Sequence, residues 1–310
     1  QSAFSTYMEF KRLMQNNGRS VSKEYDEMLL KAGYYNALLY GPNGSSLQYG
    51  DESYGKSTGQ KFPDLATWYG DRELEYITSF GSKGEKPSWT SMHFFDSQTT
   101  TMRSDWKKDA LFLFTTARGG GQHGHADDNA LTVIAYDRTL LNDAGIFTYT
   151  SSDPYRRWAL STRAHNTVEI NNTTQGAGSY NPGKNHDWAT TAQYDFLNQS
   201  TKAYSGFDHQ RNVVFVKPNF WIVSDLMIPS NMNKANDYKQ LWHMLPTANL
   251  KSNDTTKQIT SNYASGANII VASADQDAKV VEEMGWYDYS YQQLAEAKYG
   301  YFAKDGVVGK

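Results

Sequence analysis

The spacing of apolar residues changes near residue 85, and this change limits what the chain can fold into. Before it, apolar residues such as Val21, Tyr25 and Met28 recur at intervals of three to four, which is typical of amphipathic helices. After about residue 88, short β-prone runs alternate with turn residues, and no long helical period separates them. This pattern favours a large antiparallel sandwich over a parallel α/β sheet. The runs lie at residues 110–116, 131–136, 166–170, 213–216, 220–224, 240–245 and 267–272.

The first part of the chain is expected to be helical. We predict helices near residues 4–14 and 21–38, and a third helix from Pro63 to a stop at Gly81. Such helices cannot bury their apolar stripes alone, so we expect them to pack on the following domain or on helices outside this chain. The sequence therefore predicts a mainly β protein with an N-terminal α segment. Its predicted domains are residues 1–85, which are helical, and residues 86–310, which form the antiparallel β-sandwich.

Composition argues against several classes of function. The net charge is −3, from 30 basic and 33 acidic residues, so no overall positive field attracts nucleic acid or an anionic membrane. The chain has no cysteine, which excludes disulfides, thiolate metal sites and cysteine nucleophiles. Its longest apolar runs, at residues 111–114, 131–135 and 269–272, are far shorter than the roughly 18 residues of a membrane-spanning helix. We expect no nucleic-acid partner and no membrane insertion.

Histidines and acids gather around two of the predicted strands. His123 and His125 precede the run at residues 131–136, and in a strand their i, i+2 spacing would point both to the same side. A turn then reverses the chain towards Asp143, so Asp143 ends the hairpin partner of the strand that His125 introduces. His165 opens the next run. We therefore expect His125, Asp143 and His165 to lie close together.

These three residues are a candidate metal site. Nitrogen and carboxylate donors without a thiolate suit zinc, with manganese as the alternative. The other interpretation is that they are separate turn and surface residues, which is the commoner case for an isolated His-x-His pair. The glycines at residues 119–121 favour a site, because glycine lets the backbone come close to a ligand.

The same stretch resembles the heparinase II/III-like family of polysaccharide lyases. The resemblance implies a toroid of helices packed on a β-sandwich, with anionic, uronate-containing glycans cleaved by β-elimination in the groove between them. The helices and the loop at residues 41–51 are similar to the end of that toroid, so the resemblance covers most of the chain and weakens after about residue 230. Its motifs lie at residues 121–127, 141–145, 153–157, 162–168 and 211–225.

The resemblance also implies roles for individual residues. It places His123 in the active site and assigns zinc binding to His125, Asp143 and His165. Elimination requires a neutralised uronate carboxylate, a base for the α-proton and an acid for the leaving oxygen. A histidine suits the base because its ordinary pKa is near neutral. Heparan sulfate, hyaluronan, chondroitin and alginate remain open as substrates.

Three further residues are candidates for substrate binding. Arg118 and Arg157 flank the proposed ligands in sequence, and a guanidinium pairs with carboxylate or sulfate through two parallel hydrogen bonds. Their alternative role is ordinary surface ion pairing. Tyr155 can stack on a sugar ring or share in proton transfer, although most of the 22 tyrosines must be structural. His243 alternates with apolar neighbours, which predicts a packed histidine and not a ligand.

The family's catalytic tyrosine and its carboxylate-binding residue have no counterpart that we can match before His123. We therefore expect the chain to be the C-terminal part of a longer enzyme, with the remaining toroid helices as its partner, and to be inactive alone. The resemblance implies a periplasmic or secreted location. The alternative function is a non-catalytic glycan-binding or structural module that keeps the metal site. A metal-dependent hydrolase is a weaker third reading, because the same ligands can activate water.

Overall fold

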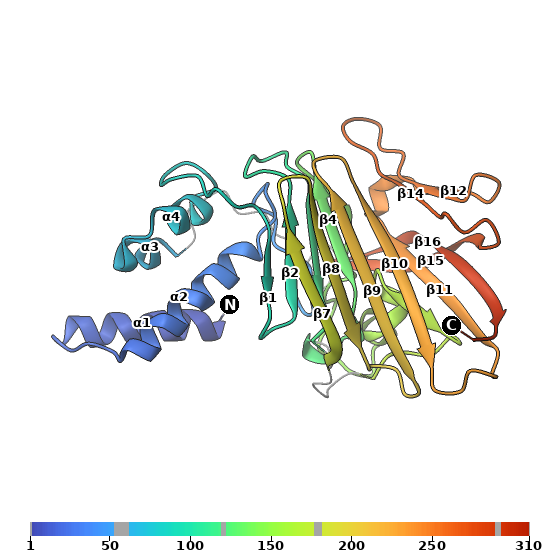
Figure 1. Cartoon of the computed structure of the whole chain (residues 1–310), viewed down its shortest axis with the longest axis horizontal. Helices are drawn as coiled ribbons and strands as arrows, with labels where there is room; N and C mark the ends of the chain where they lie inside the picture. The colour runs from blue at the N-terminus through green and yellow to red at the C-terminus, as the bar shows by residue number, and fades with distance from the viewer. Residues whose placement is uncertain (1, 53–61, 119–121, 177–181, 289–292, 310) are drawn as a thin grey trace.

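The computed structural model describes residues 2–52, 62–118, 122–176, 182–288 and 293–309. Helices α1 (Ser2–Asn16), α2 (Lys23–Leu38), α3 (Pro63–Tyr69) and α4 (Arg72–Thr78) lie together at one end of the molecule, and the sheets form the rest (Figure 1). Ser22 caps α2, because its side chain accepts a hydrogen bond from the backbone N–H of Tyr25. None of the described helices is long and apolar enough to cross a membrane.

The prediction of a single third helix is wrong, because the structure has two separate helices there, α3 and α4. Gly70 adopts a left-handed φ of 60° and ends α3, which is the usual role of glycine at a helix C-terminus. Asp71 then caps α4 by accepting a hydrogen bond from the backbone N–H of Leu74. A glycine followed by an aspartate therefore stops one helix and starts the next.

The sheets are antiparallel throughout the described strands. The first sheet follows chain order, with β1 (Met92–Phe94), β2 (Thr99–Arg103), β3 (Phe112–Thr116), β4 (Leu131–Ala135) and β5 (Arg138–Leu141). The second has the order β10 (Phe220–Pro229), β9 (Phe207–Val216), β8 (Tyr194–Thr201) and β7 (Pro182–Thr190).

Two further sheets complete the sandwich. One has the order β15 (Lys279–Asp288), β16 (Leu294–Val307), β11 (Asn236–His243) and β6 (Val168–Ile170). The other is small and consists of β12 (Lys251–Asn253), β13 (Gln258–Thr260) and β14 (Ile270–Ala272). Short helical segments connect these strands, namely η1 (Gln122–Gly124), α5 (Pro154–Leu160), η2 (Thr162–Ala164) and η3 (Pro246–Ala248).

Strands β3 and β4 are buried on both faces, which explains their continuous apolar runs. On one face, Leu113 and Val133 join the main core together with Phe215 of β9. On the other face, Phe114 packs with Leu47, from the segment that follows α2. The segment around Leu47 is thereby fixed to the sandwich, and it carries the chain towards the site described below.

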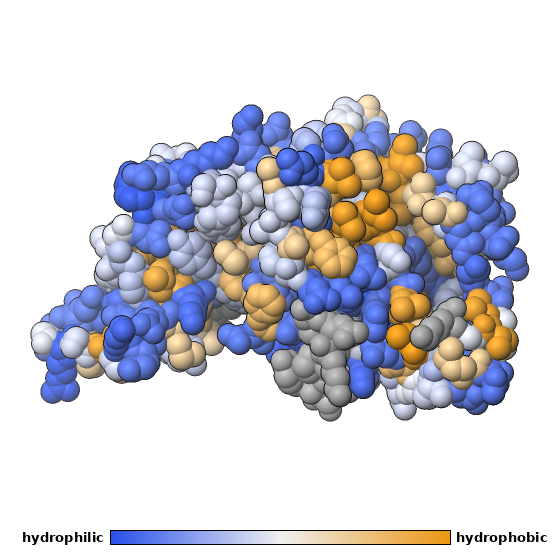
Figure 2. All heavy atoms as spheres, viewed as in Figure 1, coloured by the Kyte–Doolittle hydropathy of each residue, from blue (hydrophilic) through white to orange (hydrophobic). Residues whose placement is uncertain are grey.

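The helices form a second core that is joined to the first sheet. Leu38 and Leu74 pack there with Trp106, and Met92 and Phe94 of β1 lie against the same cluster. Away from the helices, apolar side chains gather on the face of the molecule where β9 and β10 lie (Figure 2). The helices are therefore attached through β1 and the turn after β2.

The predicted fold class is confirmed, since antiparallel sheets dominate and helices lie at the N-terminal end. The sequence runs underestimate the length of β9 and β10 and do not indicate β15 or β16. The described helices α1–α4 end at Thr78 and β1 begins at Met92. The division into two domains at residue 85 stays a prediction.

Candidate functional site

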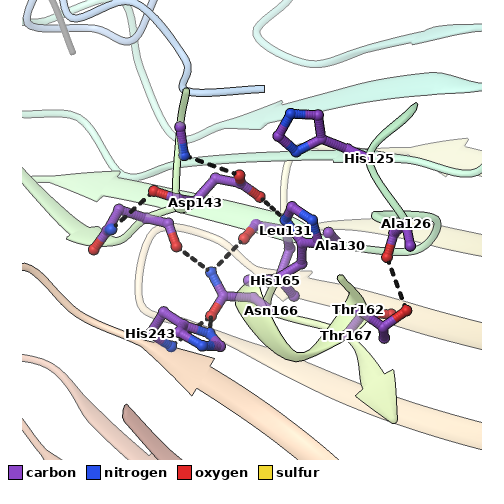
Figure 3. A network of polar contacts seen from close by, with 12 residues as sticks. His125, Ala126, Ala130, Leu131, Asp143, Thr162, His165, Asn166, Thr167 and His243 are labelled. Atoms are coloured by element: carbon purple, nitrogen blue, oxygen red, sulfur yellow. Dashed lines mark hydrogen bonds and ion pairs between the residues drawn. The ribbon is translucent and has the colours of Figure 1, made fainter. Parts of the chain in front are cut away.

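His125, Asp143 and His165 lie together beneath the protein surface. All three are buried, and the ligand atoms that they offer lie within 4.8 Å of one another. Figure 3 shows Asp143 and His165 pointing towards each other, with His125 approaching from a separate loop. The convergence predicted from the sequence is present, and these residues form a possible metal site.

A tight hairpin places Asp143. Tyr136 and Asp137 join β4 to β5 with φ values of 53° and 63°, a left-handed pair that suits a two-residue hairpin turn. The register pairs Leu141, the last residue of β5, with Val133 of β4. Asp143 follows directly after this pairing, so the hairpin carries its carboxylate back towards the loop before β4.

Asn166 anchors the loop that presents His165. Its Nδ2 donates hydrogen bonds to the carbonyl oxygens of Leu131 and Asn142, both at 2.9 Å. Its Oδ1 accepts a 2.6 Å hydrogen bond from the backbone N–H of His243 (Figure 3). Asn166 therefore ties β4, the end of β5 and β11 together, and this holds the preceding residue, His165, in place.

Two buried ring nitrogens, His125 Nδ1 and His165 Nε2, have no hydrogen-bond partner among the described residues. His165 uses its other nitrogen, Nδ1, at 2.6 Å from Asp143 Oδ2. Leaving a polar atom buried and unpaired costs about 1–3 kcal/mol, so such an atom requires an explanation, for example a bound ion or water. Two imidazoles and one carboxylate are a ligand set that zinc takes in proteins. The residues present therefore fit a metal ion.

Burial and charge act differently on the two imidazoles. Burial opposes protonation of His165, but the carboxylate of Asp143 outweighs it and raises the His165 pKa. At His125 burial dominates and lowers the pKa, despite a hydrogen bond to Asp51. Burial also raises the pKa of Asp127 to about 8, and the nearby charge of Asp143 adds to the shift. A cation between these groups would relieve the repulsion between the two carboxylates.

His123 and His125 do not lie in a strand, so the condition under which their spacing would point both to the same side is not met. His123 lies in η1 with a φ of 54°, and Gly124 follows with a φ of 86°. Two successive left-handed residues turn the chain sharply, so the alternation of a strand does not apply. The His123 side chain is 64% exposed, whereas His125 is fully buried. The glycines at residues 119–121 lie outside the described residues.

Asp51 connects the exposed histidine to the buried one. Its Oδ1 lies 2.9 Å from His125 Nε2 and 2.5 Å from Arg156 Nη1. Its Oδ2 lies 3.3 Å from His123 Nδ1. Burial opposes ionisation of Asp51, but the hydrogen bonds from His125 and Arg156 outweigh it and lower the Asp51 pKa. The site therefore contains a buried, ionised carboxylate between two histidines.

Sequence reasoning missed the role of Asp51 and did not single out Arg156. Asp51 entered only as the end of the loop that resembles the family's toroid, and Arg156 only as part of the motif at residues 153–157. Arg156 is buried in α5, and its Nη2 also lies 3.4 Å from the carbonyl oxygen of His123. The signal available in the sequence was an acid directly after a glycine, Gly50. In the structure Gly50 has a left-handed φ of 61°.

The printed contacts of Arg157 and Tyr155, two of the three predicted substrate-binding residues, are with residues outside the buried triad. Arg157 is exposed and donates a hydrogen bond to the carbonyl oxygen of Ser152. Tyr155 is half-buried and packs edge-on against Phe147 and Trp286. Arg118 is half-buried just after β3. Substrate binding by these three residues stays a prediction.

His243 is a packed histidine, as its alternation with apolar residues predicts. It is buried and stacks on Tyr299, with 4.8 Å between ring centroids and 14° between ring planes. Burial, together with the nearby His165, lowers the pKa of His243 to about 3. His243 is therefore a neutral part of the core beside the site.

In sequence, this chain is similar to known lyases. The profile of a family described as heparinase II/III-like, C-terminal, matches residues 87–299. The chain is 24% identical over 228 residues to the heparin-sulfate lyase of Pedobacter heparinus, a match covering 72% of this chain and 34% of that protein. It is 22% identical over 233 residues to the heparin-sulfate lyase of Bacteroides stercoris, covering 71% and 33%. The matches thus span about a third of the length of these relatives.

The fold is similar to that of solved lyase structures. The crystal structure of heparan sulfate lyase HepC from Pedobacter heparinus superimposes with a TM-score of 0.89 at 20% identity, covering 100% of this chain and 49% of that chain. A crystal structure of heparinase III gives a TM-score of 0.83 at 15% identity, covering 98% and 50%. At these identities the likeness establishes the fold. This chain spans about half of each solved chain.

Proposed function

This chain belongs to the heparinase II/III-like family, and from that membership we propose that it is the metal-bearing β-sandwich portion of a polysaccharide lyase. The proposed substrate is a uronate-containing glycosaminoglycan of the heparan sulfate type, because the similar proteins are heparin-sulfate lyases. One observation carries the proposal, namely an exposed histidine, His123, that a buried carboxylate connects to a buried His-Asp-His set.

The proposed reaction breaks the bond between C4 of the uronate and the glycosidic oxygen. A base removes the proton on C5, its electron pair forms the C4–C5 double bond, and the departing oxygen takes up a proton. Negative charge that develops on the uronate carboxylate must be stabilised. No water is added, so the product carries a 4,5-unsaturated uronate and gains ultraviolet absorbance.

His123 is the proposed base. Its ring is 64% exposed, and its Nδ1 faces Asp51, so Nε2 is the nitrogen that a bound glycan can reach. Imidazole is the side chain that most readily exchanges protons near neutral pH. The acid that protonates the leaving oxygen and the group that neutralises the uronate are proposed to lie in the rest of the enzyme, so this chain alone is expected to be inactive.

Zinc is the proposed metal of His125, Asp143 and His165, with manganese as the alternative. When bound, the ion supplies positive charge that offsets Asp143 and holds three loops together. All three side chains are buried, which supports a role in shaping the loop of His123 and not in touching the glycan.

The partners proposed for this chain are the anionic glycan and the remaining toroid helices of the same enzyme. Arg118 and Arg157 are the proposed contacts for carboxylate or sulfate groups, and their partial or full exposure is compatible with that role. Tyr155 is proposed as a further contact, although its packing on Phe147 and Trp286 also gives it a structural role. A periplasmic or secreted location is proposed on the family resemblance alone.

Replacement of His123 by alanine in the full-length protein tests this function. Loss of a general base lowers kcat by about 10²–10⁴-fold, so we expect the rate of unsaturated product formation on heparan sulfate to fall by that factor. Met284→Ala is the matched control, since Met284 is also exposed, at 53%, and lies on β15. Circular dichroism and zinc content check that both variants keep the fold and the metal.

Each alternative has its own signature in this assay. Unchanged turnover by a folded His123→Ala protein would show that His123 is not the base. Saturated products without new ultraviolet absorbance would indicate a hydrolase. Tight binding of a uronate oligosaccharide without any product from the full-length protein would favour the non-catalytic module.

A further inference from the structure

We propose that Asp51 is a positioning residue that fixes the ring orientation and tautomer of His123 and His125 at the same time. The inference rests in part on the proposed function, because it takes His123 as the base and His125 as a metal ligand. It goes further by assigning a role to a residue in the loop after the helices, 74 residues before His125 in the chain. The two oxygens of one carboxylate serve the two histidines separately.

The first oxygen sets the tautomer of His125. Asp51 Oδ1 lies 2.9 Å from His125 Nε2, and an ionised carboxylate only accepts hydrogen bonds. A bare Nε2 would place two lone pairs against each other at that distance. The guanidinium of Arg156 also lies near Nε2, but its Nη1 is farther away, at 3.4 Å, so the shorter contact with Asp51 assigns the proton to Nε2. The remaining nitrogen, Nδ1, then has a free lone pair, and it is the atom that is buried without a partner among the described residues. This is the tautomer that a metal ligand needs.

The second oxygen is placed to orient His123. Asp51 Oδ2 is buried and has no aligned hydrogen bond among the described residues, yet it lies 3.3 Å from His123 Nδ1. Hydrogen bonds of catalytic groups are often long in a substrate-free protein and tighten when the substrate is bound. A small rotation of the exposed ring would complete the bond from Nδ1 to Oδ2. It would leave the lone pair on Nε2 directed away from the protein, towards a glycan.

Asp51 holds this position independently of either histidine. Arg156, which lies in α5, donates a hydrogen bond from Nη1 to Asp51 Oδ1 at 2.5 Å. Its guanidinium also places a positive charge beside the carboxylate. Three residues earlier, Gln48 donates to the carbonyl oxygen of Asp288 at 3.1 Å and accepts from Tyr287 at 2.6 Å. Leu47 is packed in the core. The loop is therefore anchored to the sandwich just before Asp51, and Arg156 holds the carboxylate itself.

The test uses two variants of Asp51 in the full-length protein, with Glu52→Gln as the matched control. Asp51→Asn keeps the shape, but its single amide oxygen can accept from only one of the two histidines. Asp51→Ala removes both contacts. Glu52 is the adjacent carboxylate, and it makes none of the contacts to His123, His125 or Arg156 described above.

We expect Asp51→Ala to bind zinc about 10–100-fold more weakly, in competition with a chromophoric chelator, because the orienting partner of a ligand histidine is lost. Asp51→Asn keeps one accepting oxygen, so we expect it to lose zinc affinity or kcat, according to which histidine that oxygen serves. For Asp51→Ala we also expect kcat on heparan sulfate to fall by at least about tenfold with KM little changed, because substrate contacts remain. The Glu52→Gln variant should match the parent protein in zinc affinity and in kcat. Folded Asp51 variants with parental zinc affinity and parental kcat would overturn the inference.

A measurement on the unaltered protein covers the case in which the variants do not fold. Nitrogen-15 chemical shifts of ring-labelled histidine should show protonated Nδ1 at neutral His123 and protonated Nε2 at His125, with His123→Ala identifying the first signal. The opposite tautomer at either residue would overturn the inference. Absence of lyase turnover by the parent protein would refute the proposed function instead, and zinc affinity and tautomers would still decide the role of Asp51.

Discussion

Helix α5 carries Arg156 into the site. The helix can lie where it does only because residue 285 is a glycine, with no side chain to collide with it. A Cβ atom added to Gly285 of β15 would lie 2.5 Å from Cζ2 and 2.9 Å from Cη2 of Trp158, which is in α5. It would also lie 3.2 Å from Cδ1 of Tyr299. Gly285→Ala should therefore push the Trp158 indole and α5 away from β15.

The size of this effect follows from the overlap. Carbon atoms in contact prefer about 3.5–4.0 Å, so Trp158 or α5 must move by roughly 1 Å. Such overpacking costs about 1–3 kcal/mol, while alanine gains about 0.5–1 kcal/mol over glycine inside a strand. The middle of the first range minus the middle of the second gives a net loss of about 1.2 kcal/mol. With roughly 2.1 cal/mol/K of unfolding entropy per residue, a chain of 310 residues should lose about 1–3 °C in Tm.

Thermal unfolding measured by calorimetry tests this expectation, and Trp158→Phe provides the control. Phenylalanine lacks the outer ring atoms that the new methyl group meets, so Gly285→Ala should cost less in a Trp158→Phe background, as a double-mutant cycle would measure. A Gly285→Ala protein as stable as its parent would refute the steric argument. Equal costs in both backgrounds would show that Trp158 is not the group displaced.

Two other predictions concern the buried triad and its neighbour. Elemental analysis should find about one zinc per chain. The Asp143→Ala variant should lose this zinc, because one of its three protein ligands is gone. Retention of zinc by this variant would show that Asp143 is not a ligand. His243 titrates near pH 3 when folded and near 6.5 when unfolded, so its contribution to stability is complete above about pH 6.5 and is lost as the pH falls towards 3. In chelator-treated protein, denaturant unfolding between pH 6 and 4 should therefore show a slope about 1.4 kcal/mol per pH unit smaller for His243→Phe, and an unchanged slope would contradict the assignment.

Local patterns were enough to predict the buried triad. Asp143 follows a hairpin whose turn is local, and His165 precedes a strand that returns to the same region. Short apolar runs likewise indicated strands. Strands β3 and β4 are buried at every position, and their residues are correspondingly apolar along most of their length. Where an element depends on its own residues and those nearby, the sequence is sufficient.

The predictions that failed depended on backbone geometry at single residues. Adjacent left-handed φ values at His123 and Gly124 turn one histidine outwards and leave His125 inside, which the i, i+2 spacing cannot reveal. The break at Gly70 splits the third helix in the same way. In both cases a left-handed residue changes the direction of the chain, so the side chains after it no longer follow the spacing of the segment before it.

The pattern of residues thus predicted an antiparallel sandwich with a His-Asp-His cluster, because hydrophobic alternation and hairpin spacing act over short distances along the chain. Packing alone brought Asp51 to His125, 74 residues away, and Arg156 to Asp51, 105 residues away. It also selected Arg156 over Arg157, since neighbouring side chains on a helix point about 100° apart and only one can face the carboxylate. Such choices follow from how the loop after α2 and helix α5 dock on the sandwich, which no short window of sequence specifies.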